Sequence, residues 1–264
     1  MSKLGHIYNH KKDKPTGLEE KFEVKHYTVE STALPTSFDL RTNNPLVPSI
    51  LDQGQLGSCG PNELSNALKF CLAKHSQNPD VWQPSRLYIY YFTRLVEGEP
   101  SDQDTGISIG GAFQALLKYG SCSEIHWPYV ISKYTVEPLQ CCITAGETHC
   151  KSLKYLSVNQ DLVSIKQALV SGCNVVIGIQ VYESFESAEV ASTGTVPMPN
   201  TSTEQLLGGH CLSIWSYDDT TLTFGVMNSW GTTWGQQGYC KIPYQYILDP
   251  NLSSDFWIIT AFGP

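Results

Sequence analysis

No segment of the 264-residue sequence has the roughly 18 consecutive apolar residues from which a helix can cross a bilayer. The sequence has no basic excess either, because 25 acidic and 17 basic residues give a net charge of −8. Nucleic acid or an anionic membrane surface is therefore not expected as the main partner. No apolar segment follows the first lysines, so the sequence predicts no signal peptide. With 41% hydrophobic residues, the composition is typical of a globular protein with one large domain or two packed lobes.

The sequence also lacks the cysteine spacing of a metal centre. Nine cysteines leave one odd thiol if the others pair, and we expect reduced thiols in the cytoplasm or another reducing compartment. The cluster Cys141, Cys142, His149 and Cys150 has no paired C-x-x-C or H-x-x-x-H spacing. Disulfides or free thiols are therefore favoured over a zinc site, and we predict no metal and no cofactor.

Apolar periodicity predicts a helical first half and a stranded second half. The stripe Leu64, Ala67, Leu68, Cys71 and Leu72 marks a helix that begins near residue 59. Further helices are expected over 87–95, 111–119 and 162–169, and strands over 175–181, 210–215, 222–227, 238–242 and 256–260. We expect an extension over 1–33 and a globular domain over 34–264, with a helical lobe over roughly 45–150 and a β-rich lobe over roughly 151–264.

One cysteine, Cys59, stands where a thiol can become reactive. It ends the run Gln-Gly-Gln-Leu-Gly-Ser-Cys from residue 53, at the expected start of the first helix. The helix macrodipole and the free N–H groups of the first turn favour a thiolate there, although a small buried core cysteine is the common alternative. His210 and Asn228, each in a glycine-marked segment, are candidates for the base and for the group that orients it. Gln53 can aim its amide at the same point as an oxyanion donor.

These segments resemble the site motifs of the papain-like cysteine proteases, in that family's order. The matching motifs are Gln53-Gly-x-x-Gly-Ser-Cys59, Gly209-His210 and Asn228-Ser229-Trp230-Gly231, with further matches at Gly110-Gly111, Trp127-Pro128-Tyr129 and residues 234–239. The resemblance covers roughly residues 34–262. It implies an α+β, two-lobed fold, with a helical lobe, a β-barrel-like lobe and the active-site cleft between them.

The resemblance also implies a role for each matching residue. Cys59 would be the nucleophile of a thiol endopeptidase that forms a thioester with peptide or protein substrates, and His210 would be its general base and acid. Asn228 would orient the imidazole, and Gln53 would complete the oxyanion hole with the Cys59 backbone N–H. Substrate contacts are implied for Gly110, Gly111, Gly209 and Trp230, the last also shielding the histidine–asparagine bond. We expect a monomer.

Some features depart from the family pattern. Leu56 replaces the usual disulfide-bonded cysteine and Gly60 the usual aromatic residue after the nucleophile. Two alternatives stay open: a catalytically silent binding protein of this fold, and a transpeptidase, amidase or exopeptidase with the same site. Titration of the thiolate distinguishes a silent fold from an active peptidase, because a silent fold should show no alkylation-prone Cys59. Product analysis distinguishes an endopeptidase from the other enzymes, because all of them use the same nucleophile.

Three further expectations concern the surroundings of the site. The helix N-terminus and His210 predict a thiol pKa in the range of roughly 3.5–7.5. The apolar run Phe256, Trp257, Ile258 and Ile259 predicts an apolar specificity pocket beside Gly110-Gly111, and hence an aliphatic or aromatic residue two positions before the cut. Residues 1–33 lack the periodicity of a domain, so we expect an arm on the surface, either across the cleft as an inhibitory segment that cleavage near Leu34-Pro35 releases, or elsewhere with no such role.

Overall fold

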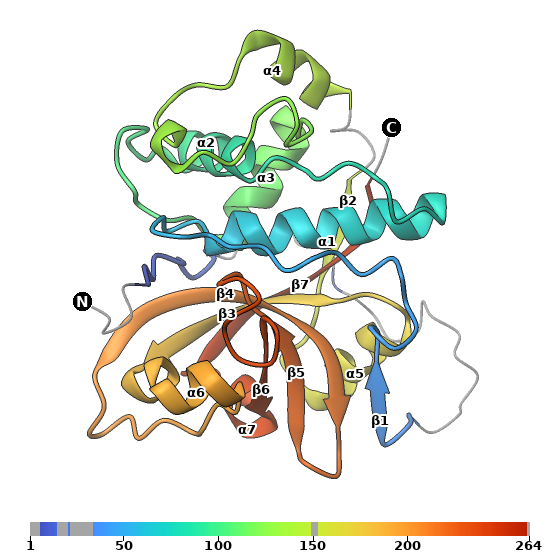
Figure 1. The fold of residues 1–264 in the computed structure, drawn as a ribbon, viewed down its shortest axis with the longest axis vertical. Helices are drawn as coiled ribbons and strands as arrows, with labels where there is room; N and C mark the ends of the chain where they lie inside the picture. Colours follow the sequence, from blue (N-terminus) through green and yellow to red (C-terminus); the bar gives the residue numbers. More distant parts are fainter. Residues whose placement is uncertain (1–5, 15–20, 22–33, 149–152, 263–264) are drawn as a thin grey trace.

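The computed structural model describes residues 6–14, 21, 34–148 and 153–262. One group of helices lies on one side of the molecule and the curved sheet, with the remaining helices beside it, lies on the other, and the long helix α1 (Cys59–Ser76) runs between them (Figure 1). Residues 6–14 run between the start of α1 and the end of the sheet at β4 (Leu206–Asp218). None of the helices within the described residues is long and apolar enough to cross a membrane.

Local signals account for the ends of the main helices. Ser85 caps α2 (Arg86–Glu97) by accepting a hydrogen bond from the Tyr88 backbone N–H, and Ser108 caps α3 (Ile109–Tyr119) in the same way. Asp161 caps α5 (Leu162–Val170) as its position before an apolar stripe predicts. The short helices α4 (Gln140–Glu147), α6 (Ala188–Thr193) and α7 (Tyr244–Leu248) were not predicted, because so few residues carry no clear period.

Seven strands form one sheet in the order β2-β7-β3-β4-β5-β6, with β1 pairing on β4. The strands are β1 (Ser37–Asp39), β2 (Lys154–Ser157), β3 (Val175–Tyr182), β4, β5 (Thr223–Met227), β6 (Tyr239–Pro243) and β7 (Ser253–Ala261). All the named pairs are antiparallel. The sheet is strongly curved in Figure 1 but is not closed within the described residues, so the second lobe is barrel-like without being a barrel.

Two apolar clusters correspond to the two lobes. One packs the inner faces of β3, β4 and β5 against α5, and its members include Ile177, Leu212 and Phe224. The other packs α1, α2 and α3 together and includes Leu68, Tyr88 and Phe113. Because α1 lies between them, its first turn is delivered to the boundary between the lobes.

The eight cysteines that the structure describes are all free thiols. His149 and Cys150 of the candidate cluster lie outside the described residues.

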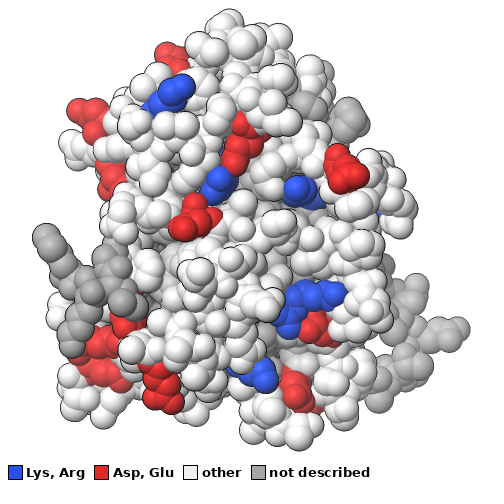
Figure 2. All heavy atoms as spheres, viewed as in Figure 1, with Lys and Arg blue, Asp and Glu red and all other residues white. Residues whose placement is uncertain are grey.

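On the face shown in Figure 2, lysine and arginine side chains form small, separate groups among aspartate and glutamate side chains.

Candidate active site

The structure brings Cys59 and His210 together from opposite lobes. Cys59 is the first residue of α1, as the sequence predicts, and His210 lies on β4, with both side chains buried. The backbone N–H groups of Gly60 and Cys211, the residue after His210, lie close enough to the Cys59 thiol to stabilise its anion. The thiol therefore lies at a helix N-terminus and beside the strand that carries the histidine.

Asn228 holds the imidazole ring in one orientation. Its Oδ1 lies 2.9 Å from Nε2 of His210, and Trp230 stacks on the ring with a centroid distance of 4.9 Å. Nδ1 of His210 is buried and has no hydrogen-bond partner among the described residues. Because Asn228 Oδ1 can only accept a hydrogen bond, Nε2 of His210 carries the hydrogen and donates it, and Nδ1 is free to act as a base.

Gln53 is oriented by Ser229. The Ser229 hydroxyl donates to Gln53 Oε1 at 2.8 Å, which leaves the Gln53 Nε2 group to donate to the carbonyl of Leu56 at 3.0 Å and to that of Ile7 at 3.5 Å. The Ile7 carbonyl thus lies at the place where a substrate oxyanion would be bound. Ser229 was not predicted to support Gln53, although it is part of the Asn-Ser-Trp-Gly motif.

Residues 6–14, which we call the arm, lie along this site. The His10 backbone N–H donates to the Gly209 carbonyl at 2.9 Å, and the Gly110 N–H donates to Asp13 Oδ1 at 2.7 Å. The Tyr8 ring meets the His210 ring edge-on at 5.7 Å. Residues 6–14 of the predicted extension therefore occupy the cleft, whereas Lys21 bridges to Ser157 on β2; positions 1–5, 15–20 and 22–33 lie outside the described residues.

Glycines form the floor beneath the arm. A Cβ atom at Gly106, where φ is +68°, would come within 1.7 Å of the Asn9 carbonyl oxygen, and one at Gly57 would come within 2.5 Å of Asn9 Nδ2. At Gly208 the same atom would meet Tyr8 at 2.7 Å. Any larger residue at these positions would push the arm out of the cleft.

The two glycines at 110 and 111 have different roles. Gly110 faces the arm, whereas the Gly111 N–H donates to the Ser108 hydroxyl at the start of α3. A Cβ at Gly111 would come within 2.2 Å of Glu97 Oε1, so this glycine makes room for a carboxylate. The strand-like contact with the arm comes instead from Ile107, whose carbonyl accepts from the Lys11 N–H at 3.0 Å. The sequence analysis missed Ile107 because a single backbone carbonyl leaves no sequence signal.

Burial dominates the electrostatics of the catalytic pair. Removal from water raises the pKa of the Cys59 thiol to about 12. Burial likewise lowers the pKa of His210 to about 3. The hydrogen bond to Asn228 acts in the opposite direction and raises it, whereas the nearby His6 and His10 lower it further. Both groups are therefore neutral at neutral pH. The expected low thiol pKa is wrong for the chain with its arm in place, because that expectation assumed a thiol open to water.

Glu63 is a buried acid that the sequence analysis missed. It lies one turn after Cys59 on α1, and Ser213 on β4 donates to its Oε2 at 2.7 Å. Burial raises the pKa of Glu63 to about 8, so its carboxyl group is mostly protonated at neutral pH. An ionised Glu63 would raise the pKa of the nearby Cys59 thiol. Its position four residues after Cys59, on the same helix face, was the available signal.

The expected specificity pocket is only partly apolar. Of the four apolar residues near the C-terminus, Trp257 reaches a hollow of about 520 Å³ beside Gly110. Phe256 and Ile258 point into the core of the sheet. Glu97 and Glu99 line the same hollow, so the prediction of an apolar lining is wrong. In β7 alternate residues face opposite sides, which is why only one face of the apolar run meets the cleft.

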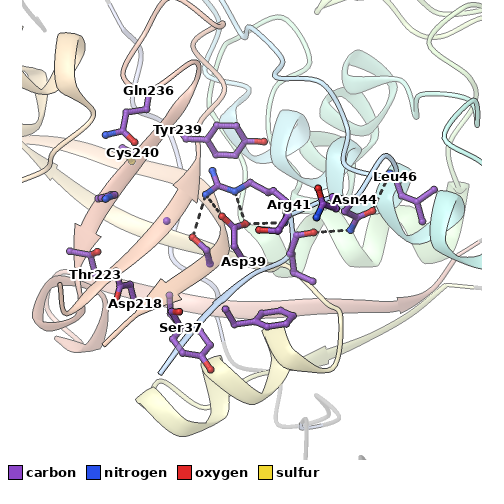
Figure 3. A pocket seen from close by; sticks show the side chains of 18 of the residues that line it. Ser37, Asp39, Arg41, Asn44, Leu46, Asp218, Thr223, Gln236, Tyr239 and Cys240 are labelled. Atoms are coloured by element: carbon purple, nitrogen blue, oxygen red, sulfur yellow. Dashed lines mark hydrogen bonds and ion pairs between the residues drawn. The ribbon is translucent and has the colours of Figure 1, made fainter. Parts of the chain in front are cut away.

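A second hollow, of about 1140 Å³, lies away from the catalytic pair beside β1 (Figure 3). Arg41 in this hollow is bound by Asp39, with Nη2 2.6 Å from Oδ2, and lies over the Tyr239 ring. None of the described residues that line this hollow is a histidine.

Fold and site together define a two-lobed hydrolase with a thiol on one lobe and a histidine–asparagine pair on the other. The family described as "Papain family cysteine protease" matches residues 34–249. The chain belongs to this family and is a cysteine protease.

Several known proteins are similar to the chain. An uncharacterized peptidase C1-like protein of Acanthamoeba polyphaga mimivirus is 42% identical over 84% of this chain and 73% of its own. Cathepsin B of Dictyostelium discoideum is 28% identical over 83% of this chain and 73% of its own. Xylellain, a cysteine protease from Xylella fastidiosa, has a TM-score of 0.83 at 31% identity and covers 96% of this chain and 95% of its own. Procathepsin L 3 of Tenebrio molitor, at 20% identity, shares the fold with a TM-score of 0.72 over 97% of this chain and 77% of its own. The predicted papain-like fold is confirmed.

Proposed function

We propose that the protein is an endopeptidase in which Cys59 attacks the substrate and His210 transfers the protons. The observation that carries this proposal is the bond between His210 Nε2 and Asn228 Oδ1, which leaves the buried Nδ1 without a hydrogen-bond partner among the described residues and available as a base. The N-terminus of α1 adds a favourable potential for the thiolate once water reaches it.

The first half of the reaction forms a thioester. Nδ1 of His210 accepts the Cys59 proton as the sulfur bonds to the scissile carbonyl carbon, and the carbonyl electron pair moves onto oxygen. Gln53 Nε2 and the Cys59 backbone N–H donate hydrogen bonds to that oxyanion. The tetrahedral intermediate then expels the amine, which takes the proton from His210.

The second half releases the acid and restores the thiol. A water molecule attacks the thioester carbon and gives a proton to Nδ1 of His210. The carbon–sulfur bond then breaks, and Cys59 recovers its proton from the imidazole. Asn228 keeps the ring in one tautomer throughout, so its contribution is orientation.

We also propose that the arm keeps this peptidase latent. Ile7 lies against the oxyanion donor Gln53, and Tyr8 covers His210. These contacts would exclude substrate, and we infer that the arm also contributes to the burial that raises the pKa of the Cys59 thiol. Release of the arm would therefore both open the cleft and activate the thiol.

A peptide-library digest with mass-spectrometric detection tests the endopeptidase proposal. The full-length chain with Tyr8→Ala, which removes the ring over His210, is compared with the same chain carrying Cys59→Ala. We expect cuts inside the peptides that disappear with Cys59→Ala. Release of terminal residues alone would favour an exopeptidase, ligated products a transpeptidase, and no turnover a silent fold.

Turnover by the full-length chain and by a chain that starts at Leu34 tests the latency proposal. We expect the shorter chain to be the faster one. Equal rates, with circular dichroism showing that both chains are folded, would contradict an inhibitory role for the arm.

A further inference from the structure

The arm is a peptide bound in the cleft, so its side chains reveal what the cleft binds. Its backbone is held on both walls, by the bond from His10 N–H to the Gly209 carbonyl at 2.9 Å and by the bond from Lys11 N–H to the Ile107 carbonyl at 3.0 Å. Lys11 also bridges to Ser108 in the manner of a short parallel strand. This anchoring directs the Lys11 side chain to the C-terminal end of α2.

Two carboxylates receive the Lys11 ammonium group there. Its Nζ lies 2.5 Å from Glu99 Oε1 and 3.9 Å from Glu97 Oε2. Both glutamates are partly buried, with 15% of the Glu97 side chain and 33% of the Glu99 side chain exposed. Partial burial strengthens such a pair relative to one fully in water.

Glu97 is held in place before any cation arrives. Its Oε1 accepts hydrogen bonds from the Ser108 N–H at 2.9 Å and from the Ser108 hydroxyl at 2.6 Å. Its Oε2 is buried and has no hydrogen-bond partner among the described residues. The unpartnered oxygen lies at the end of α2, where the negative end of the helix dipole also favours a cation. A fixed carboxylate loses little entropy when it binds a charged group.

We propose that Glu97 and Glu99 form a subsite that selects a lysine or arginine side chain of the substrate, and that Lys11 fills this subsite in the latent chain. The inference rests on the proposed peptidase function. The adjoining hollow of about 520 Å³, bounded by Gly110 and Trp257, has room for the stem of a long basic side chain. When the arm leaves, the two carboxylates lose their cation and stand next to each other, so a basic group from a substrate is favoured in its place.

Binding of a nine-residue peptide tests the subsite without requiring turnover. The peptide has the sequence of residues 6–14, with lysine or the uncharged norleucine at the place of Lys11. It is titrated into the full-length chain carrying Tyr8→Ala and Lys11→Gly, which weaken the arm and empty the subsite. We expect the lysine peptide to bind roughly 3- to 10-fold more tightly, the range for a partly exposed ion pair. The difference should shrink at high salt.

Variants of Glu97 and Glu99 show how much each carboxylate contributes to the preference for the lysine peptide. Glu99→Gln should remove most of the preference and Glu97→Gln part of it, while keeping an oxygen for Ser108. Asp102→Asn, which removes an exposed carboxylate on the following loop, is the matched control and should leave the preference unchanged. Equal binding of the two peptides, or a preference that survives both glutamine variants, would overturn the proposed subsite.

Turnover then separates this inference from the proposed function. Fluorogenic peptides with a single lysine or norleucine at successive positions should show a 3- to 10-fold preference in kcat/KM for lysine at one position. A binding preference with no Cys59-dependent hydrolysis of any peptide would uphold the subsite and contradict the endopeptidase proposal. Cys59-dependent hydrolysis with no preference for lysine at any position would uphold the endopeptidase proposal and contradict the subsite.

Discussion

The two ends of the arm contact the cleft in different ways. At the aromatic end, the His6 ring stacks on Trp230 at 3.8 Å and the Tyr8 ring meets His210 edge-on at 5.7 Å. His6 also lies 2.9 Å from a carboxylate oxygen of the nearly buried Glu186. The other end, which we call the charged end, consists of His10, Lys11 and Asp13 with their partners Asp255, Glu97 and Glu99.

This contrast suggests a division of labour. The Tyr8 ring and the Trp230 ring carry no charge near neutral pH, so their contacts with His210 exclude water with little dependence on salt, and the aromatic end is suited to burying Cys59 and His210. Contacts at the charged end depend on protonation and salt, because burial there is offset only by pairing. We therefore expect substitutions at the aromatic end to change activity most, and those at the charged end to change its dependence on conditions.

The largest effect is expected where the aromatic end covers the chemistry. In the Tyr8→Ala chain, in which the arm is weakened, Cys59→Ala should lower turnover by a factor of at least roughly 10³, because it removes the covalent route. His210→Ala should be almost as severe and should add little in the double variant, whereas Asn228→Ala should be milder because it costs orientation alone. Peptide hydrolysis measures the loss, and near-ultraviolet circular dichroism checks the fold. Full activity in the Cys59→Ala chain would end the assignment.

Removing the Tyr8 ring should expose the thiol. Loss of one large buried aromatic contact weakens arm binding by about 1.5–3 kcal/mol, so Cys59 should react with iodoacetamide about 10- to 100-fold faster in Tyr8→Ala. Tyr8→Phe is the matched control: it keeps the ring and removes a buried hydroxyl without a partner among the described residues. Mass spectrometry identifies the labelled cysteine. Unchanged labelling of Cys59 in Tyr8→Ala would show that the aromatic end does not protect it.

At the charged end, Asp13 should make arm binding depend on pH. In the bound arm, burial and, to a smaller extent, the neighbouring Asp255 raise the pKa of Asp13 from 3.8 to about 6. The Gly110 N–H, the Trp257 indole and His10 act in the opposite direction and lower this pKa. A raised pKa stabilises the bound arm fully below pH 3.8, and this contribution is lost as the pH rises through about 6. The arm should therefore open more easily as the pH rises across this window.

Asp13→Asn should remove that dependence. We measure the reaction of Cys59 with a dipyridyl disulfide, which labels thiols in acid, in the native and Asp13→Asn chains. Their rate ratio cancels the thiol's own titration and should rise by up to roughly 100-fold across the window, the change expected when the pKa rises from 3.8 to about 6. A ratio that stays flat would assign the pH dependence of the arm to other groups.

The smallest effect is expected at Glu63, which lies on α1 one turn after Cys59 and outside both ends of the arm. Its pKa rises from 4.5 to about 8 through burial, so the stability that it contributes is lost as the pH rises through about 8. Glu63→Gln keeps an acceptor for Ser213 and removes the titration, so the variant should gain stability relative to the native chain as the pH rises from 4.5 to about 8. Urea unfolding in the Cys59→Ala background measures this. Parallel pH profiles for the two chains would show that Glu63 does not ionise in that range.

Local patterns were enough to predict the framework of the site. The apolar stripe after Cys59 predicts a helix that begins near Cys59, and α1 begins there. Strand propensity around His210 places it on β4. Helix starts and strand runs depend on neighbouring residues, so these predictions need no knowledge of the fold.

The state of the site depends on contacts between distant segments. Residues 6–14 carry no apolar period, and their path follows from glycines at 57, 106 and 208 and from carboxylates at 97, 99 and 255. The thiol pKa, the burial of Glu63 and the choice of Trp257 over its apolar neighbours have the same origin.

The sequence by itself therefore determined which residues can perform thiol chemistry and on which elements they lie, because hydrogen bonding and periodicity along the chain are local. Only the tertiary structure decided that the arm covers them and that their charges are suppressed. Burial depends on which surfaces meet, and no stretch of sequence carries that information alone.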